Sequence, residues 1–189
     1  MYTEFRKSVI DLADKLPQWN SPEDRERTQL AAISSLYEEC GELCGCFSKY
    51  FTRGEHWRKN KKELEDFEKA KEKFTDEASD LLWVLVCAGN YICNEDFYSI
   101  FDNKNEQYSL TIDTALFDIM RDINILRQDI MFDEENIKAI RKDFQYLAIS
   151  YLTFVEALNE VYDITFDDIC KYNINKLNKR YDSTGKRVD

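Results

Sequence analysis

The fold class of this chain is decided by the stretch Asp76-Glu77-Ala78-Ser79-Asp80-Leu81-Leu82-Trp83-Val84-Leu85-Val86-Cys87-Ala88. Residues 81–88 are all apolar, so a helix over them is apolar on every side and has to be buried. The chain also has 12 Phe and 11 Tyr but only 5 Gly and 2 Pro, which suits long helices better than a turn-rich β fold. We therefore predict an all-α protein, an antiparallel helix bundle.

Helical spacing of apolar residues and helix start signals predict the other elements. Thr75 is placed to cap the helix that carries the quoted stretch, and the densely charged residues 60–73 before it are interpreted as a surface insertion. Residues 94–107 are expected to form a loop, and the polar tail after Asp182 is expected to be loose. Further helices are expected over residues 3–16, 21–51, 111–131, 133–162 and 165–181.

Length and charge limit the class of protein. The 189 residues match one domain, and folding would bury roughly 70% of the extended surface. The net charge of -11 repels nucleic acid and anionic membranes, so neither is expected as a partner. No apolar run has the length of a signal peptide or a membrane span, and we expect a cytoplasmic protein.

Cysteine and histidine offer little for a metal site. The six cysteines lack paired CxxC spacing, so we expect most to be buried thiols. A metal or redox use of Cys40, Cys44 and Cys46 is the weaker alternative, because Cys44 and Cys46 point roughly 200° apart around a helix. The single histidine, His56, is expected at the surface and leaves no set of ligands for zinc or a di-iron bundle.

Two acidic pairs suggest the chemistry of the protein. Glu39 and Glu42 stand three residues apart on one expected helix, and Glu77 and Asp80 do so on another. This spacing puts both carboxylates of a pair on one helix face, and both faces border apolar stripes. If the two faces converge, each close pair of charges costs roughly 3 kcal/mol at an effective dielectric constant of 20. A bound cation would offset this repulsion.

The alternative is that the acids make only surface or capping interactions. Glu77 is expected in a first helical turn, where an acid gains roughly 0.3 to 1 kcal/mol from the helix dipole. Against this alternative, buried carboxylates seldom lack partners, and few Lys or Arg residues are expected on these faces. Ligands that are all oxygen favour Mg²⁺ or Mn²⁺, and a magnesium site in an acidic pocket usually serves a phosphate substrate.

The acidic motifs carry a resemblance to a known family. Residues 39–42 (ECGE) followed by residues 77–80 (EASD) resemble the ExxE and ExxD motifs of the MazG-like, all-α nucleoside triphosphate pyrophosphohydrolases. Residues 36–43 resemble the family's EExxEL helix, residues 76–85 its second acidic helix, and residues 173–181 its closing N-x-x-K-L-x-x-R-Y segment. The chain departs from the family in a longer gap between Glu42 and Glu77 and in the extra helices over about 109–162.

The resemblance implies one domain, 1–189, with a four-helix metal-binding core over about 17–93 and 165–181 and a helical insertion over about 109–162. It implies a homodimer or homotetramer that cleaves nucleoside triphosphates between the α and β phosphates, giving a monophosphate and pyrophosphate. Glu39, Glu42, Glu77 and Asp80 would hold Mg²⁺, and Glu38 would orient or deprotonate the attacking water. The expected substrate-binding residues are Asn173, Lys176, Arg180, Tyr181, Lys49, Trp19 and Trp57.

Several alternatives stay open at this point. Lys176 and Arg180 also suit dipole compensation at a helix C-terminus, and Lys49 is the weaker phosphate ligand. Trp19 and Trp57 are placed to stack on a base, whereas Trp83 is expected in the core. The substrate could be another pyrophosphate-linked nucleotide, such as phosphoribosyl-ATP or an alarmone. A non-catalytic acidic helical protein that binds a partner or a structural cation is the alternative from another class.

Overall fold

The computed structural model describes residues 2–16, 19, 25–51, 61–93, 111–132, 136–182 and 184–188. The described chain is all-α, as predicted, apart from one isolated β-bridge between Tyr181 and Arg187. Its helices are α1 (Tyr2–Ala13), α2 (Arg25–Cys46), η1 (Phe47–Phe51, a π-helix), α3 (Lys61–Ala88), η2 (Gly89–Cys93, a π-helix), α5 (Ile112–Phe132), α6 (Ile137–Tyr162) and α7 (Phe166–Arg180).

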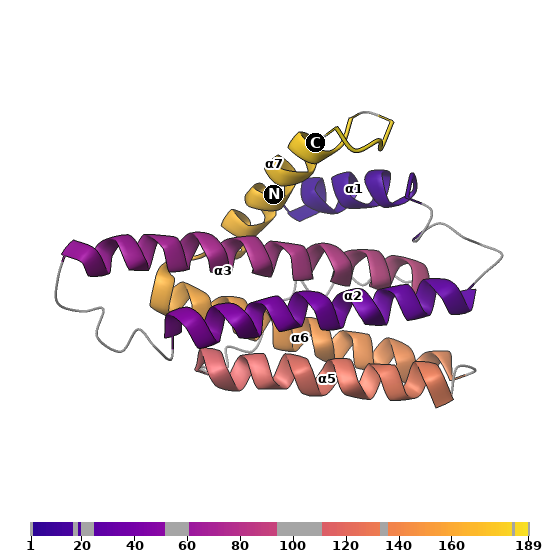
Figure 1. Ribbon diagram of the computed structural model, residues 1–189. Coiled ribbons are helices and arrows are strands. Elements are labelled where there is room, and N and C mark those ends of the chain that lie inside the picture. The colour runs from indigo at the N-terminus through magenta and orange to yellow at the C-terminus, as the bar shows by residue number, and fades with distance from the viewer. Residues whose placement is uncertain are drawn as a thin grey trace.

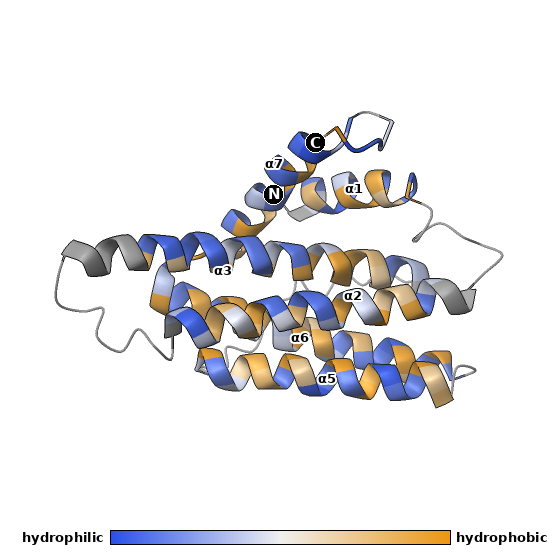
Figure 2. Cartoon of the chain, in the orientation of Figure 1, coloured by the Kyte–Doolittle hydropathy of each residue, from blue (hydrophilic) through white to orange (hydrophobic). Residues whose placement is uncertain are grey.

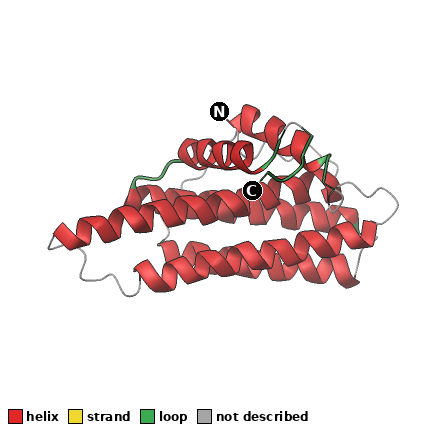
Figure 3. Cartoon of the chain, turned by 45° about the horizontal axis from the view of Figure 1, so that its top comes forward, coloured by secondary structure: helices red, strands yellow, loops and turns green. Residues whose placement is uncertain are grey.

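Four long helices, α2, α3, α5 and α6, lie side by side, and the shorter α1 and α7 pack on α3 (Figures 1 and 3). Tyr37 on α2 donates to Asn124 on α5, and Cys44 on α2 contacts Met120 on α5. Because residue numbers rise along α2 while those of its contacts fall along α5, these two helices are antiparallel. None of the described helices is long and apolar enough to cross a membrane.

The core is centred on the stretch that predicted the fold. Leu81, Leu82 and Leu85 on α3 are 0% exposed, and one cluster of buried side chains joins all the α-helices. From α6, the Tyr151 hydroxyl donates to the carbonyl oxygen of Ala78 at 2.8 Å, which fixes α6 against the middle of α3. The acidic residues of α3 are therefore held on a rigid, buried helix.

Helix α3 begins earlier than predicted. Thr75 is not a cap, because its hydroxyl donates to the Lys71 carbonyl oxygen at 2.8 Å within a continuous helix. Residues 61–88 contain no Gly or Pro, so nothing interrupts the helix. The charged segment also carries an apolar stripe: Phe67 and Phe74 pack on Tyr162 with ring centroids 5.3 and 5.1 Å away. Beyond the first turns of α3, which are grey, Figure 2 shows mostly hydrophilic residues along the middle of the helix and more hydrophobic ones toward its C-terminal end.

The last two helices have the caps that such sequences favour. The Asn136 side chain accepts from the Ala139 N–H at 3.2 Å and starts α6, so the acids at 133–135, outside the described residues, precede the cap. Thr165 and Asp168 form a capping box at the start of α7, as the sequence predicts. These caps fix where α7 begins and hence which of its residues reach α3.

The C-terminal tail is more ordered than predicted. The carboxylate of Asp182 accepts hydrogen bonds from the N–H groups of Thr184 and Lys186 at 2.8 and 3.0 Å, and the chain turns back to form the bridge at Tyr181. Gly185 has a φ of +79°, and a Cβ there would lie 2.8 Å from Lys15 Cβ. Glycine thus serves both the turn and its close approach to the end of α1.

Candidate metal centre

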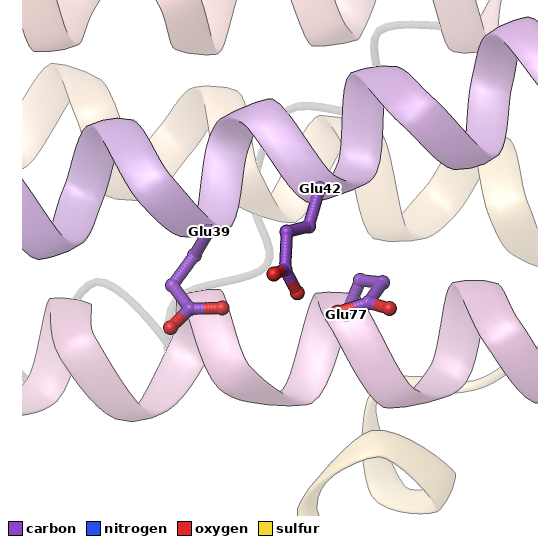
Figure 4. Close-up of side chains that lie close together, drawn as sticks. All are labelled: Glu39, Glu42 and Glu77. Carbon is purple, nitrogen blue, oxygen red and sulfur yellow. The ribbon is translucent and has the colours of Figure 1, made fainter.

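Three glutamates converge where α2 faces α3. Glu39 and Glu42 extend from α2, one turn apart, toward Glu77 on α3 (Figure 4). One carboxylate oxygen from each lies within 4.8 Å of the other two, and we call these residues the glutamate triad. Glu77 is buried, Glu39 is partly buried and Glu42 is exposed, so the triad is open to solvent at one side. The expected convergence of the two acidic faces is confirmed for these three residues.

Two carboxyl groups of the triad resist ionisation. Burial, followed by the negative charges of Asp80 and Glu42, raises the pKa of Glu39 to about 7. Burial also raises the pKa of Glu77, and a hydrogen bond with the Glu42 carboxyl group adds to this effect, while Lys73 opposes it. Too little positive charge lies near Glu39 and Glu77 to offset the cost of ionising their buried carboxyl groups. Glu39 is therefore protonated in a large share of molecules near pH 7.

The neighbouring aspartates, in contrast, are paired with lysines. Lys176 on α7 donates to Asp76 Oδ1 at 2.5 Å and to the Asp80 carboxylate. Lys73 donates to Asp76 Oδ2 and to Glu77 Oε1, both at 3.1 Å. We call Asp76 and Asp80 the lysine-bridged aspartates. The expectation that cations would be too few on these faces is wrong for Glu77, which pairs with Lys73, and for Asp80, which pairs with Lys176. For Glu39 the charges that shift the pKa are all negative.

The pKa values of Asp76 and Asp80 are shifted in opposite directions. Burial works to raise the pKa of Asp76, but the hydrogen bonds and charges of Lys176 and Lys73 outweigh it and lower that pKa. Burial raises the pKa of Asp80 despite its bond to Lys176. Asp80 lies outside the set of oxygens within 4.8 Å, so the predicted fourth metal ligand is held by Lys176 in this arrangement.

Glu77 is not a first-turn residue. Helix α3 starts at Lys61, so Glu77 lies in the helix interior, where the dipole offers an acid no first-turn stabilisation. The dipole-based alternative for this residue is therefore wrong. Its described favourable partner is Lys73, one turn earlier on the same helix.

Asn173 joins α7 to α3. It is 0% exposed, and its Nδ2 donates to the Ser79 carbonyl oxygen at 2.9 Å. Its Oδ1 is buried and has no hydrogen-bond partner among the described residues. Asn173 thus sets the register of α7 on α3, one turn before Lys176, and complete burial removes it from direct contact with a substrate in this arrangement.

The other predicted phosphate ligands lie near the surface. Arg180 is exposed, and its charge acts to lower the pKa of Asp80, which places it near that carboxylate. Tyr181 ends α7 and is half-buried at the β-bridge. Lys49 is exposed, with Nζ 4.8 Å from the ring centroid of Tyr50, and Glu38 is exposed on α2 beside the triad.

The predictions for the three tryptophans have different outcomes. Trp19 is 2% exposed and packs edge-on against Trp83 and face-on against Tyr91, with ring centroids 5.8 and 6.4 Å away. We therefore correct its assignment from base contact to core, because its ring is buried against Trp83 of α3 and Tyr91 of η2. Trp83 packs against the core as expected. Trp57 and His56 lie outside the described residues.

The thiols are mostly core residues, as expected. Cys40, Cys46, Cys87 and Cys170 are buried, and Cys44 is half-buried. A hydrogen bond between the side chains of Cys40 and Cys44 lowers the pKa of Cys44 to about 7 and raises that of Cys40. The Cys44 thiol also lies 3.7 Å from the Met120 sulfur. No cysteine belongs to the acidic cluster found among the described residues.

Sequence reasoning missed Lys73, Asp76 and Ser79 as parts of this region. The signal for Lys73 was present, since it precedes Asp76 by three residues and Glu77 by four, the spacing of helical ion pairs. No protein-family model, curated protein or solved structure matches this chain. The MazG-like resemblance therefore rests on the motif residues alone and stays a prediction.

Proposed function

We propose that this chain is a Mg²⁺-dependent nucleoside triphosphate pyrophosphohydrolase, which cleaves between the α and β phosphates. The observation that carries the proposal is the glutamate triad, in which carboxylates from two helices meet within 4.8 Å. Two of the three acids have raised pKa values, and carboxyl groups with perturbed pKa values gather at functional sites. The resemblance of the two acidic motifs to the MazG-like family supports the same assignment.

The donor set fits a hard cation. Mg²⁺ binds oxygen at about 2.0–2.1 Å, so ligands on one ion lie roughly 3 to 4 Å apart. Oxygens within 4.8 Å reach that spacing through small side-chain rotations, because glutamate side chains have three rotatable bonds. Mn²⁺ suits the same ligands. Asp80 is close enough to influence the pKa of Glu39 and serves as a further ligand.

In this proposal the residues around the triad have separate roles in accepting a proton, binding phosphate and positioning α7. Glu39, Glu42 and Glu77 would hold the cation, which when bound would supply positive charge to the triphosphate and lower the pKa of a water molecule. Glu38, exposed beside Glu39, accepts a proton from the attacking water. Arg180 and Lys176, one turn apart on α7, bind phosphate oxygens, and Asn173 holds α7 in the register that presents them.

Product analysis tests this proposal. The protein is incubated with ribo- and deoxyribonucleoside triphosphates and Mg²⁺, and the products are resolved by ion-exchange chromatography beside Asp80→Asn and Glu68→Gln variants. We expect monophosphate and pyrophosphate from the wild type and from Glu68→Gln, whose residue is exposed on α3 away from the triad, and loss of both products in Asp80→Asn. Intact triphosphates throughout would contradict the proposal. The same assay with phosphoribosyl-ATP and an alarmone would then show whether the substrate is another pyrophosphate-linked nucleotide.

One observation favours a second candidate, a non-catalytic acidic protein. Lys73 and Lys176 neutralise part of the acidic charge without any metal, as a purely structural arrangement would require. The two candidates differ in the response of the melting temperature to Mg²⁺. A catalytic metal centre predicts that Mg²⁺ raises the melting temperature of the wild type and that the rise fades in Glu39→Gln. The structural candidate predicts no effect of Mg²⁺.

A further inference from the structure

Lys176 is built into the fold as a partly buried positive charge. Its side chain is 13% exposed, and its ammonium group bridges Asp76 and Asp80 on α3. The Asn173 bond to the Ser79 carbonyl fixes α7 one turn earlier, so the place of Lys176 does not depend on its own ion pairs. An ammonium group has three N–H donors, and two of them are used by these aspartates.

The two aspartates that bind Lys176 differ in their other contacts. Asp76 accepts from both Lys73 and Lys176, and it lies outside the glutamate triad. Asp80 is bonded to Lys176, yet among neighbouring charges it has the largest effect on Glu39 of the triad. Asp80 therefore lies close to both the triad and Lys176. Its carboxylate is able to bind a cation at the triad or to pair with Lys176, but not to do both fully.

We propose that Lys176 is an internal counter-ion that Asp80 exchanges for the divalent cation. In the metal-free protein Asp80 pairs with Lys176. When the cation binds, Asp80 joins the triad, and Lys176 stays on Asp76 with an N–H donor released for a phosphate oxygen. This inference rests on the metal site of the proposed function, and it makes Lys176 a positioning residue that links metal binding to anion binding.

The exchange has a consequence that a merely structural ion pair lacks. Lys176 competes with the cation for Asp80 but assists the binding of a phosphate once the cation is in place. Removing the ammonium group should therefore strengthen Mg²⁺ binding and weaken triphosphate binding. Couplings of this kind between two ligands usually amount to about 5- to 150-fold in affinity.

The test is a calorimetric titration of the full chain with Mg²⁺ alone, and then with a non-hydrolysable triphosphate at saturating Mg²⁺. Lys176→Met is compared with Lys179→Met, which removes the same charge from an exposed position on α7. We expect Lys176→Met to bind Mg²⁺ about tenfold more tightly than Lys179→Met and the triphosphate about tenfold more weakly. Equal Mg²⁺ affinities in the two variants would overturn the exchange and leave the metal site intact. A wild type that binds no Mg²⁺ would overturn both proposals.

A second measurement uses the wild type and does not depend on a folded Lys176→Met variant. Acylation of lysines by an amine-reactive reagent is followed by mass spectrometry with and without Mg²⁺. We expect Mg²⁺ to increase the labelling rate of Lys176 about threefold or more, because one of its two ion pairs is lost, and to leave exposed Lys179 unchanged. Labelling of Lys176 that Mg²⁺ does not change would contradict the exchange.

Discussion

Glu77 of the glutamate triad lies within one helical turn of both lysine-bridged aspartates on α3, yet the triad and the aspartates meet different charges. Glu77 faces the acidic side of α2, whereas Asp76 and Asp80 face Lys176 on α7. The pKa values of Glu39 and Glu77 are raised, whereas that of Asp76 is lowered; burial still raises the pKa of Asp80 despite its bond to Lys176. Helix spacing thus determines which acids share a face, but the neighbouring helix decides whether they meet cations or further acids.

The largest expected effect comes from breaking the triad. Glu39→Gln keeps the size of the side chain but removes a ligand charge, and the loss of residues that merely support metal ligands already costs about 10- to 100-fold. We therefore expect pyrophosphate release to fall by more than about 100-fold. Initial rates at saturating Mg²⁺ measure this effect, with Glu68→Gln on the exposed side of α3 as the control. Activity within threefold of the wild type would remove Glu39 from the site.

The next effect concerns the helix that carries Lys176. Asn173→Ala removes the amide that docks α7 on α3 and leaves the buried Ser79 carbonyl oxygen without this donor. We expect the free energy of unfolding to fall by about 1–3 kcal/mol. Urea denaturation measures the change against Asn175→Ala, an exposed position on the same helix. Equal losses in the two variants would show that the Asn173 bond does not hold α7 in place.

The pH dependence of stability tests the triad without metal. The pKa of Glu39 is about 7 in the folded protein against 4.5 for an ordinary glutamate, so the folded state retains a proton that the unfolded chain has released. Stability should therefore fall as pH rises from about 4.5 to about 7. We expect a loss of about 1–2 kcal/mol after allowing for solvent screening of a partly exposed group.

This dependence should be specific to the triad. Denaturation of the metal-free protein at a series of pH values should show a smaller loss in Glu39→Gln, which has no proton to release. A pH profile that is the same in the wild type and in Glu39→Gln would show that the charges of the triad are already compensated.

The smallest expected effect is that of removing Lys73. Lys73 links the two regions by pairing with Asp76 and Glu77, but its side chain is 48% exposed. Exposed ion pairs contribute about 0 to 1 kcal/mol, so Lys73→Met should lower the free energy of unfolding by less than about 1 kcal/mol. Thermal denaturation beside Lys69→Met, exposed on the same helix, measures it. A loss above 2 kcal/mol would mean that Lys73 rather than burial controls Glu77.

Much of the fold follows from local sequence. The apolar run 81–88 predicts a buried helix, and the capping box of Thr165 and Asp168 predicts the start of α7; the structure contains both. The three-residue spacing of the acids also predicts that Glu39 and Glu42 share one face of α2. These features depend on helix geometry within a few turns, which the sequence specifies directly.

What the sequence did not predict depends on contacts between distant segments. Lys176 reaches Asp80 across 96 residues, and no local pattern identifies that pairing. The start of α3 was missed because its charged surface obscured the stripe that includes Phe67 and Phe74. Trp19 follows a short helix and was expected to stack on a base, but it packs on Trp83 and Tyr91, which are distant in the sequence.

We expect the glutamate triad to bind a divalent cation. The most direct test is a calorimetric titration with Mg²⁺ at pH 7 in two buffers that differ in ionisation enthalpy. Because Glu39 has a pKa of about 7, binding there should release a proton from a substantial share of the molecules, and the heat should differ between the buffers. Our account predicts saturable binding with proton release that disappears in Glu39→Gln. No saturable binding by the wild type, or equal binding by Glu39→Gln with the same proton release, would contradict it.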